Sequence, residues 1–221
     1  MVAYRKVITS VASPALVTAL LVFASEARAT EDRGGLHNGE TMSRGAVMPF
    51  IEAGWPDVTL GVAYGVTDWF DIGGRVGFVY GPFYLPTRSL LYNGMAFSVP
   101  LRFAVAESGD MRVLVHVDPG AAILGFRPLF FAVQMPVGVE VGFRLDEHAT
   151  FQLGLDVPMR VNLVENVHFH LAPMVGPGME YRSGKLVLGA RGRFGATIAA
   201  GGDVSLVWFG FLGQAYFGYK F

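Results

Sequence analysis

Two histidines, His168 and His170, stand one residue apart and could together bind a metal ion or relay a proton. Glu165 is near them in the sequence, but no third ligand is fixed, so histidines hydrogen-bonded to their neighbours are the favoured interpretation. Nucleophilic chemistry has weak support, because the chain has neither a G-x-S-x-G motif nor a cysteine. We therefore predict no catalytic residues, no metal and no cofactor.

Most of the other candidate residues are ionic side chains that alternate with apolar ones. If the apolar face of each segment points outward, these residues line an interior, where arginines need carboxylate partners. Acids and bases are nearly balanced, which predicts a salt-bridged, plugged or narrow lumen, although many glycines there would leave room. The predicted lumen network comprises Glu52, Asp71, Arg75, Arg102, Arg112, His116, Asp118, Glu140, Arg144, Asp156, Arg160, Glu180, Arg191 and Arg193.

The elements that must position these residues are strands, because the hydropathy of the chain has a period of two. From Phe131 to Leu145, every second residue is apolar and the residues between are small, polar or charged. Such alternation over 11 or more residues excludes an amphipathic helix. The ten predicted strands are 45–53, 58–67, 69–80, 93–105, 111–123, 130–145, 150–161, 168–181, 186–198 and 204–221.

Tight turns separate every second pair of strands, and longer loops separate the others. This arrangement, with long alternating strands, is typical of a closed antiparallel up-and-down transmembrane β-barrel. Prolines inside the predicted strands must mark bulges, strand ends or wrong boundaries, since a closed barrel has no free edge. We expect breaks at Pro119 and Pro177, and counts of 8 or 12 strands stay open beside ten.

Composition favours lipid rather than water outside the sheet. The chain is 52% hydrophobic and only 16% charged, with a mean hydropathy of +0.42. Beyond residue 29 its only lysines are Lys185 and Lys220, whereas a soluble sheet normally covers its outer face with lysine and glutamate. A net charge of −1 gives no basic surface for nucleic acid, and the absence of cysteine excludes disulfides.

The first residues predict an export signal. A basic start at Arg5 and Lys6, an uncharged apolar stretch and the sequence Ala27-Arg28-Ala29 form the pattern of a secretory signal peptide. We predict a signal peptide over 1–29, read by the Sec pathway, a flexible leader over 30–44, and the barrel over 45–221.

The last strand carries a more specific signal. Phe209, Phe211, Phe217, Tyr219 and the terminal Phe221 alternate along one face. This strand resembles the C-terminal strand of bacterial outer-membrane β-barrel proteins. The run from Ala63 to Gly73 resembles a periplasmic hairpin that recurs in small barrels of this class. Together with the export signal, the chain resembles small single-domain barrels of the OmpA, OmpX and OmpW type.

The resemblance implies a Gram-negative outer membrane, with outer-membrane lipid around a monomeric barrel. It also implies periplasmic chaperones and a barrel-assembly machinery that reads Phe217, Tyr219 and Phe221. A structural or small-solute pore role is the favoured function, with a slight preference for small anions if the barrel conducts. The alternatives are an outer-membrane lipid-modifying enzyme and a surface adhesion or interaction barrel acting through loop 81–92.

Overall fold

The computed structural model describes residues 34–81, 93–125, 129–163, 168–201 and 204–221. The predicted signal peptide, Glu165 and nearly all of loop 81–92 lie outside these residues. All regular structure within them is antiparallel β-strand, in one sheet. No helix in the described part of the chain has the length and hydropathy needed to cross a membrane.

Fifteen strands make up the sheet, and they alternate in side-chain burial as the period of two predicts. In β10, for example, Gln152, Gly154 and Asp156 are buried whereas Leu153 and Leu155 are exposed. The strands are β1 (Val47–Trp55), β2 (Asp57–Thr67), β3 (Phe70–Val79), β4 (Gly94–Ser98), β5 (Leu101–Ser108), β6 (Met111–Val117), β7 (Gly120–Leu124), β8 (Phe130–Gln134), β9 (Val137–Arg144), β10 (Ala149–Val157), β11 (Met159–Leu163), β12 (His168–Leu171), β13 (Met174–Ser183), β14 (Leu186–Gly201) and β15 (Val204–Tyr219).

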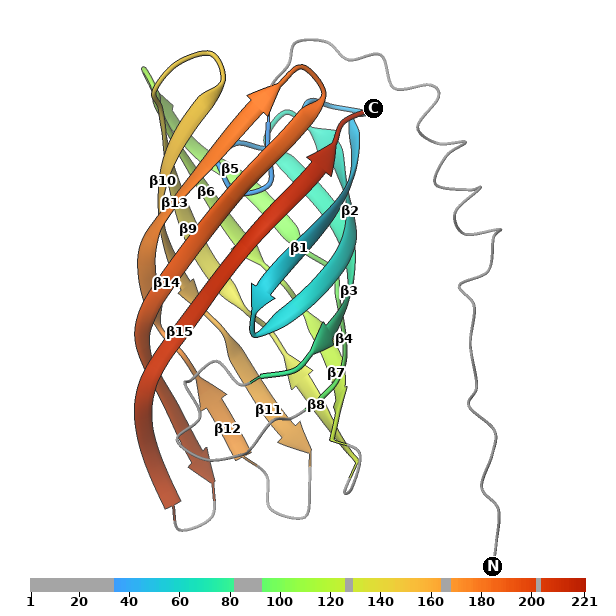
Figure 1. Ribbon diagram of the computed structural model, residues 1–221, viewed down its shortest axis with the longest axis vertical. Coiled ribbons are helices and arrows are strands. Elements are labelled where there is room, and N and C mark those ends of the chain that lie inside the picture. Colours follow the sequence, from blue (N-terminus) through green and yellow to red (C-terminus); the bar gives the residue numbers. More distant parts are fainter. Residues whose placement is uncertain (1–33, 82–92, 126–128, 164–167, 202–203) are drawn as a thin grey trace, which may run out of the picture.

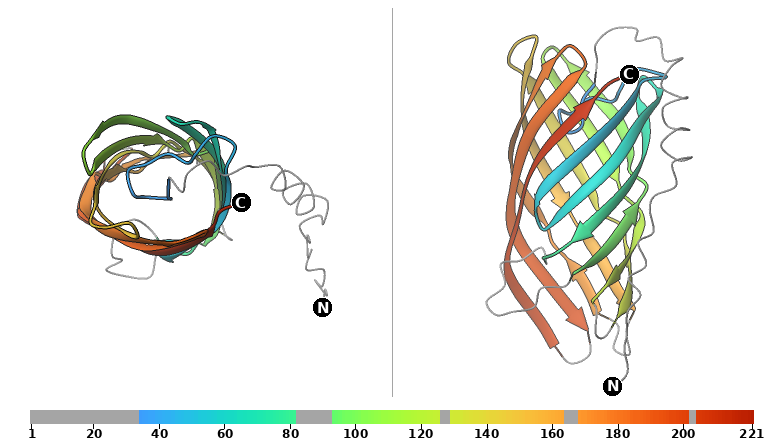
Figure 2. Two further views of the ribbon diagram at one scale, coloured as in Figure 1. Left: turned by 90° about the horizontal axis from the view of Figure 1, so that it is seen from above. Right: turned by 45° about the vertical axis from the view of Figure 1, so that its right-hand side comes forward.

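The sheet closes on itself into a barrel-like wall (Figure 1). One circuit of pairings runs from β3 through β2, β1, β15, β14, β13, β10, β9, β6 and β5 back to β3. A second runs from β14 through β15, β1, β2, β3, β4, β7, β8, β11 and β12 back to β14. Viewed from above, the strands surround an interior, called the lumen below (Figure 2).

Prolines explain why the strands outnumber the ten that the sequence predicts. Five predicted strands are each divided in two, at Pro100, Pro119, Pro136, Pro158 and Pro173. A proline has no N–H to donate, but its carbonyl still accepts a bond. The Gly73 N–H donates to the Pro100 carbonyl at 2.8 Å, and the carbonyls of the other four prolines also accept backbone bonds from a neighbouring part of the wall.

The strand breaks expected at Pro119 and Pro177 had different outcomes. Pro119 does interrupt a strand, between β6 and β7. The predicted break at Pro177 is wrong, because this residue lies inside β13 with its side chain on the exposed face. Pro177 stays paired with Leu153 of β10, so the strand continues there, whereas the pairing of β13 with β14 skips Gly176 and Pro177.

Tight turns gather at one end of the sheet, where the C-terminus also lies (Figure 1). Gly109 and Gly184 have φ values of 55° and 57° in the β5–β6 and β13–β14 turns, a region that L side chains rarely adopt. The last residue is tied there too, because the Phe221 N–H donates to the Val47 carbonyl at 2.9 Å. We call this end the turn end.

Candidate functional site: a lumen filled by ion pairs and by the chain itself

Residues 34–46, called the plug below, lie inside the lumen at the turn end (Figure 2). Residues 34–42 are all buried, and Leu36 and Met42 pack with Met48, Phe50 and Tyr216 of the wall. The sequence predicts a flexible leader here because the segment is polar and contains glycine. Its placement differs from that expectation, since a lumen lined by polar groups accepts a polar segment.

Glycines let the plug fold back and approach the wall. Gly34, Gly39 and Gly45 have φ between 81° and 87°, which only glycine adopts without strain. On the wall, Gly142 leaves the space that the Asn38 carbonyl occupies, and a Cβ there would lie only 1.7 Å from that oxygen. Bulkier residues at these positions would therefore exclude the plug.

Side chains of the wall satisfy the backbone of the plug. Glu180 accepts bonds from the N–H groups of Leu36 and His37, at 3.0 and 3.2 Å. Asp71 accepts from the Met42 N–H at 3.0 Å. Arg102 donates to the Leu36 carbonyl at 2.6 Å and pairs with Asp71 at 2.5 Å. Because buried backbone groups need partners, these contacts hold the plug in one position.

The plug also inserts an imidazole into the ion network of the wall. His37 Nε2 lies 2.6 Å from Glu52 of β1, and Nδ1 lies 2.8 Å from Glu140 of β9. Arg75 is 3.6 Å from Glu52, and Arg191 is 3.5 Å from Glu140. The ring stands edge-on to Tyr216 at 5.0 Å. His37 therefore connects opposite parts of the wall through the middle of the lumen.

A second group of ion pairs lies beside the first. Asp156 accepts from Arg193 Nε at 2.8 Å and lies 3.0 Å from His116 Nε2. His116 is 3.7 Å from Asp118, which pairs with Arg75 at 3.3 Å. Arg193 has no exposed surface. A buried guanidinium is tolerated only with such partners, so this group specifies how the strands must be arranged.

Inward glycines make room for these side chains rather than for an open passage. A Cβ at Gly154 would meet the Arg193 guanidinium at 2.1 Å, and one at Gly138 would meet His116 at 2.2 Å. A cavity of about 110 Å³ remains, lined by His37, His116 and Asp118 among others. Asp118 Oδ1 and Glu140 Oε2 are buried without a hydrogen-bond partner. The cavity has room for a few water molecules, which would satisfy such oxygens.

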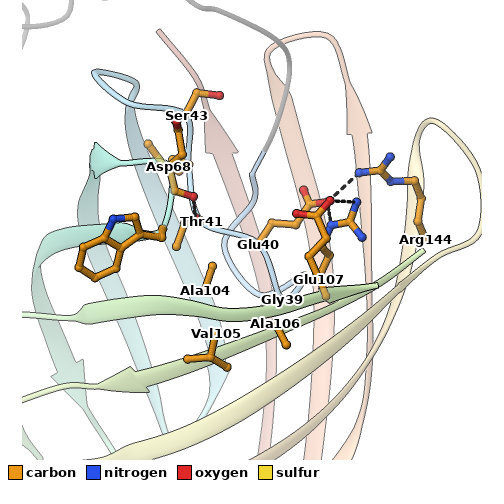
Figure 3. A pocket seen from close by; sticks show the side chains of 13 residues that line it. Gly39, Glu40, Thr41, Ser43, Asp68, Ala104, Val105, Ala106, Glu107 and Arg144 are labelled. Carbon is orange, nitrogen blue, oxygen red and sulfur yellow. Dashed lines mark hydrogen bonds and ion pairs between the residues drawn. The ribbon is translucent and has the colours of Figure 1, made fainter. Parts of the chain in front are cut away.

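The turn-end mouth of the lumen holds a larger pocket of about 710 Å³ (Figure 3). Glu40 of the plug lies at its edge, 2.9 Å from Arg144, 3.0 Å from Arg182 and 3.9 Å from Arg112. Burial raises the pKa of Glu40, but Arg182 and Arg144 lower it more, so its pKa lies below the usual 4.5. Glu40 is thus held as a carboxylate that anchors the plug.

Most of the predicted lumen residues lie inside the wall and touch one another. Arg112 and Arg144 are instead at the mouth, where Arg144 is exposed. Arg160 is buried and lines the small cavity. The residues of the network that are both buried and paired with an oppositely charged side chain or with histidine are Glu52, Asp71, Arg102, His116, Asp118, Glu140, Asp156, Arg191 and Arg193.

His168 and His170 lie together on β12, and His170 Nε2 is 3.1 Å from the amide of Asn162. Among the described residues, no group of three histidine, cysteine, aspartate or glutamate side chains is placed to hold a metal ion.

Sequence reasoning missed several residues of the site. Arg182 lies two residues after Glu180 on the inward face of β13, and Gln214 lies on the inward face of β15. The period of two could therefore have identified both residues. Gln214 accepts from Arg191 at 2.8 Å and donates to Asp57 at 2.8 Å. His37 and Glu40 carry no such signal, because they belong to no alternating segment.

No protein-family model matches the chain, and no curated protein or solved structure matches it either.

Proposed function

We propose that this chain is an integral outer-membrane β-barrel whose lumen is closed by its own N-terminal segment. The observation that carries the proposal is the inverted distribution of side chains. Leu60, Phe131 and Phe209 are each more than half exposed, whereas Glu140, Glu180 and Arg193 are at most 1% exposed. A water-soluble protein would bury the first group and solvate the second.

Continuity of the strands favours a membrane-spanning wall of ten. Each proline break is one or two residues long, and backbone bonds to the next strand continue across it. The divided strands β4 with β5, β6 with β7, β8 with β9, β10 with β11 and β12 with β13 then act as single strands, each long enough to cross the hydrocarbon core at a tilt. In a closed wall, neighbouring strands supply the hydrogen-bond partners of the backbone groups, which lipid cannot do.

Aromatic side chains toward both ends of the strands support the same membrane-spanning arrangement. Phe143 and Phe151 are 6.4 Å apart, and Phe70 and Phe103 4.9 Å apart, toward the turn end. Phe78 and Tyr80 are 6.5 Å apart at the opposite end of β3. Rings of this kind settle at the two interfaces of a bilayer.

A structural role, or a pore that opens only when the plug leaves, fits the filled lumen best. The proposal includes export through the Sec pathway, periplasmic chaperones, assembly by the barrel-assembly machinery and a monomeric barrel in outer-membrane lipid. A small remaining conductance would slightly favour small anions, because the predicted lumen network contains seven arginines and six acids.

Three measurements test this proposal. The protein should sediment with outer membranes, and its band should migrate differently in a denaturing gel before and after boiling, as a folded barrel does. In planar bilayers, the wild-type protein should give little or no steady current. A soluble fraction without a heat-dependent shift would refute the membrane assignment, and a steady ohmic nanosiemens conductance would refute the closed lumen.

A further inference from the structure

An arginine cluster at the turn-end mouth forms a receptacle for an anion. Arg112, Arg144 and Arg182 come from three different strands, β6, β9 and β13, and converge on the single carboxylate of Glu40. Glu107 adds a second carboxylate, 2.7 Å from Arg112, but it is exposed to solvent. Three guanidinium groups thus meet two carboxylates in this cluster, and a third acid, Asp68, lines the same pocket.

The groups around Glu40 have the composition of an oxyanion site. Besides the arginines, the backbone N–H of Gly34 and the side-chain amide of Asn38 donate to Glu40 Oε2, at 3.1 and 3.2 Å. Arg182 is buried, so its contribution is only weakly screened by water. Planar guanidinium groups that face one oxygen-bearing group are the usual means by which proteins bind phosphate and carboxylate.

The 710 Å³ pocket gives a ligand from solution access to this receptacle. Arg112 and Arg144 line the pocket together with Glu40 (Figure 3), whereas Arg182 does not line it. Arg144 is exposed, and its guanidinium donates to Glu40 Oε1 at 2.9 Å. An anion in the pocket could therefore take Arg144 from Glu40 without entering the lumen. It could also contact Arg112, whose Nε lies 3.9 Å from Glu40 and whose other nitrogens bond to Glu107 and to the Gly109 and Met111 carbonyls.

We propose that Arg112 and Arg144 bind a multivalent oxyanion of the phosphate class, in competition with Glu40 of the plug. A tethered carboxylate acts at an effective concentration in the millimolar range, so a competitor needs more charge than a single carboxylate has. Once the anion is bound, Glu40 keeps Arg182 alone, and the plug is less firmly held. The pocket is then a ligand site that is coupled to closure of the lumen.

Isothermal titration of the folded, detergent-solubilised barrel with inorganic phosphate tests the site, with acetate at the same ionic strength as the monovalent comparison. Phosphate should bind at one site per chain and more tightly than acetate. Glu40→Gln removes the competitor and should tighten phosphate binding about tenfold, whereas Arg144→Gln should weaken it by about the same factor. Hydrogen exchange of the plug amides should quicken when phosphate is added to the wild-type protein.

Glu147→Gln is the matched control, because it removes one exposed carboxylate in the β9–β10 turn without touching the plug. If this variant tightens phosphate binding as much as Glu40→Gln, the effect is general electrostatics and the proposal is wrong. Phosphate that binds no better than acetate also overturns it. If Arg144→Gln fails to fold, the two glutamate variants still decide. The titration needs no membrane and no conductance, so its failure is distinct from failure of the proposed function.

Discussion

His37 Nε2 lies 2.6 Å from Glu52 Oε1, so a residue that precedes the first strand is bonded to a residue in the middle of that strand. The chain must therefore enter the lumen, turn, and leave it before β1 begins. This contact is buried on both sides. It makes the plug part of the ion network rather than a separate tail.

Gly142→Ala should dislodge the plug without a change of charge. The new Cβ would meet the Asn38 carbonyl at 1.7 Å, and a backbone atom cannot move aside as a side chain can. We expect the seated plug to lose about 1–3 kcal/mol. Hydrogen exchange of the plug amides measures this loss. Gly74→Ala is the control, because nothing lies within 4 Å of its Cβ position; equal exchange in both variants would contradict the close approach.

Removing one partner of the Asp156–Arg193 pair should be costly. Asp156→Asn leaves the Arg193 guanidinium without its 2.8 Å carboxylate partner and removes one of the two carboxylates beside His116, and we expect a loss of about 3–5 kcal/mol in the free energy of unfolding. Urea unfolding of Asp156→Asn, of Arg193→Met and of the double variant gives the coupling energy between the two side chains. A coupling energy below about 0.5 kcal/mol would show that the two side chains act independently.

Acid should loosen the plug through Glu40. Its pKa in the folded protein lies below the usual 4.5, because Arg182 and Arg144 outweigh the effect of burial. The stabilisation is therefore complete above pH 4.5 and is lost as the pH falls through the lower, folded pKa. Plug-amide exchange in the wild-type protein should quicken over this window. Part of that change should be missing in Glu40→Gln; identical pH profiles would exclude Glu40 as the cause.

The energetic cost of a charge placed at two different depths of the wall tests the membrane assignment directly. Leu155 is exposed near the middle of the β10–β11 strand, and Leu145 is exposed at the turn end. Leu155→Arg should cost about 2–4 kcal/mol in lipid vesicles, and Leu145→Arg about 0–1 kcal/mol. Equilibrium unfolding from vesicles provides both values. Similar costs for the two variants would mean that no hydrocarbon layer surrounds the wall.

A variant that lacks Phe221 distinguishes a role of this residue in assembly from a role in stability. Removal of Phe221 should lower the amount of folded protein in the outer membrane of cells, because the resemblance assigns it to the assembly signal. The same variant, refolded in detergent, should keep a nearly unchanged free energy of unfolding. An equal loss in both settings would make Phe221 a structural residue, through its ring contact with Tyr219 at 4.9 Å.

The sequence by itself determined the strands and their faces. A strand sends alternate side chains to opposite sides, so a local pattern was enough to place Glu140 and Arg193 inward and Leu155 outward. Turn residues such as Gly109 and Gly184 likewise report local backbone geometry. Proline was a weaker guide, since Pro119 ends a strand and Pro177 does not.

Only the tertiary structure decided which ionic residues meet and where residues 34–46 lie. His37 and Glu140 are 103 positions apart, and Glu40 and Arg182 are 142 apart, so closure of the sheet brings them together. From the sequence alone, a polar segment is interpreted as a solvated leader, because its surroundings are assumed to be water. Here its surroundings are the carboxylates and guanidinium groups of a closed wall, which satisfy its backbone as water would, and no local pattern contains that information.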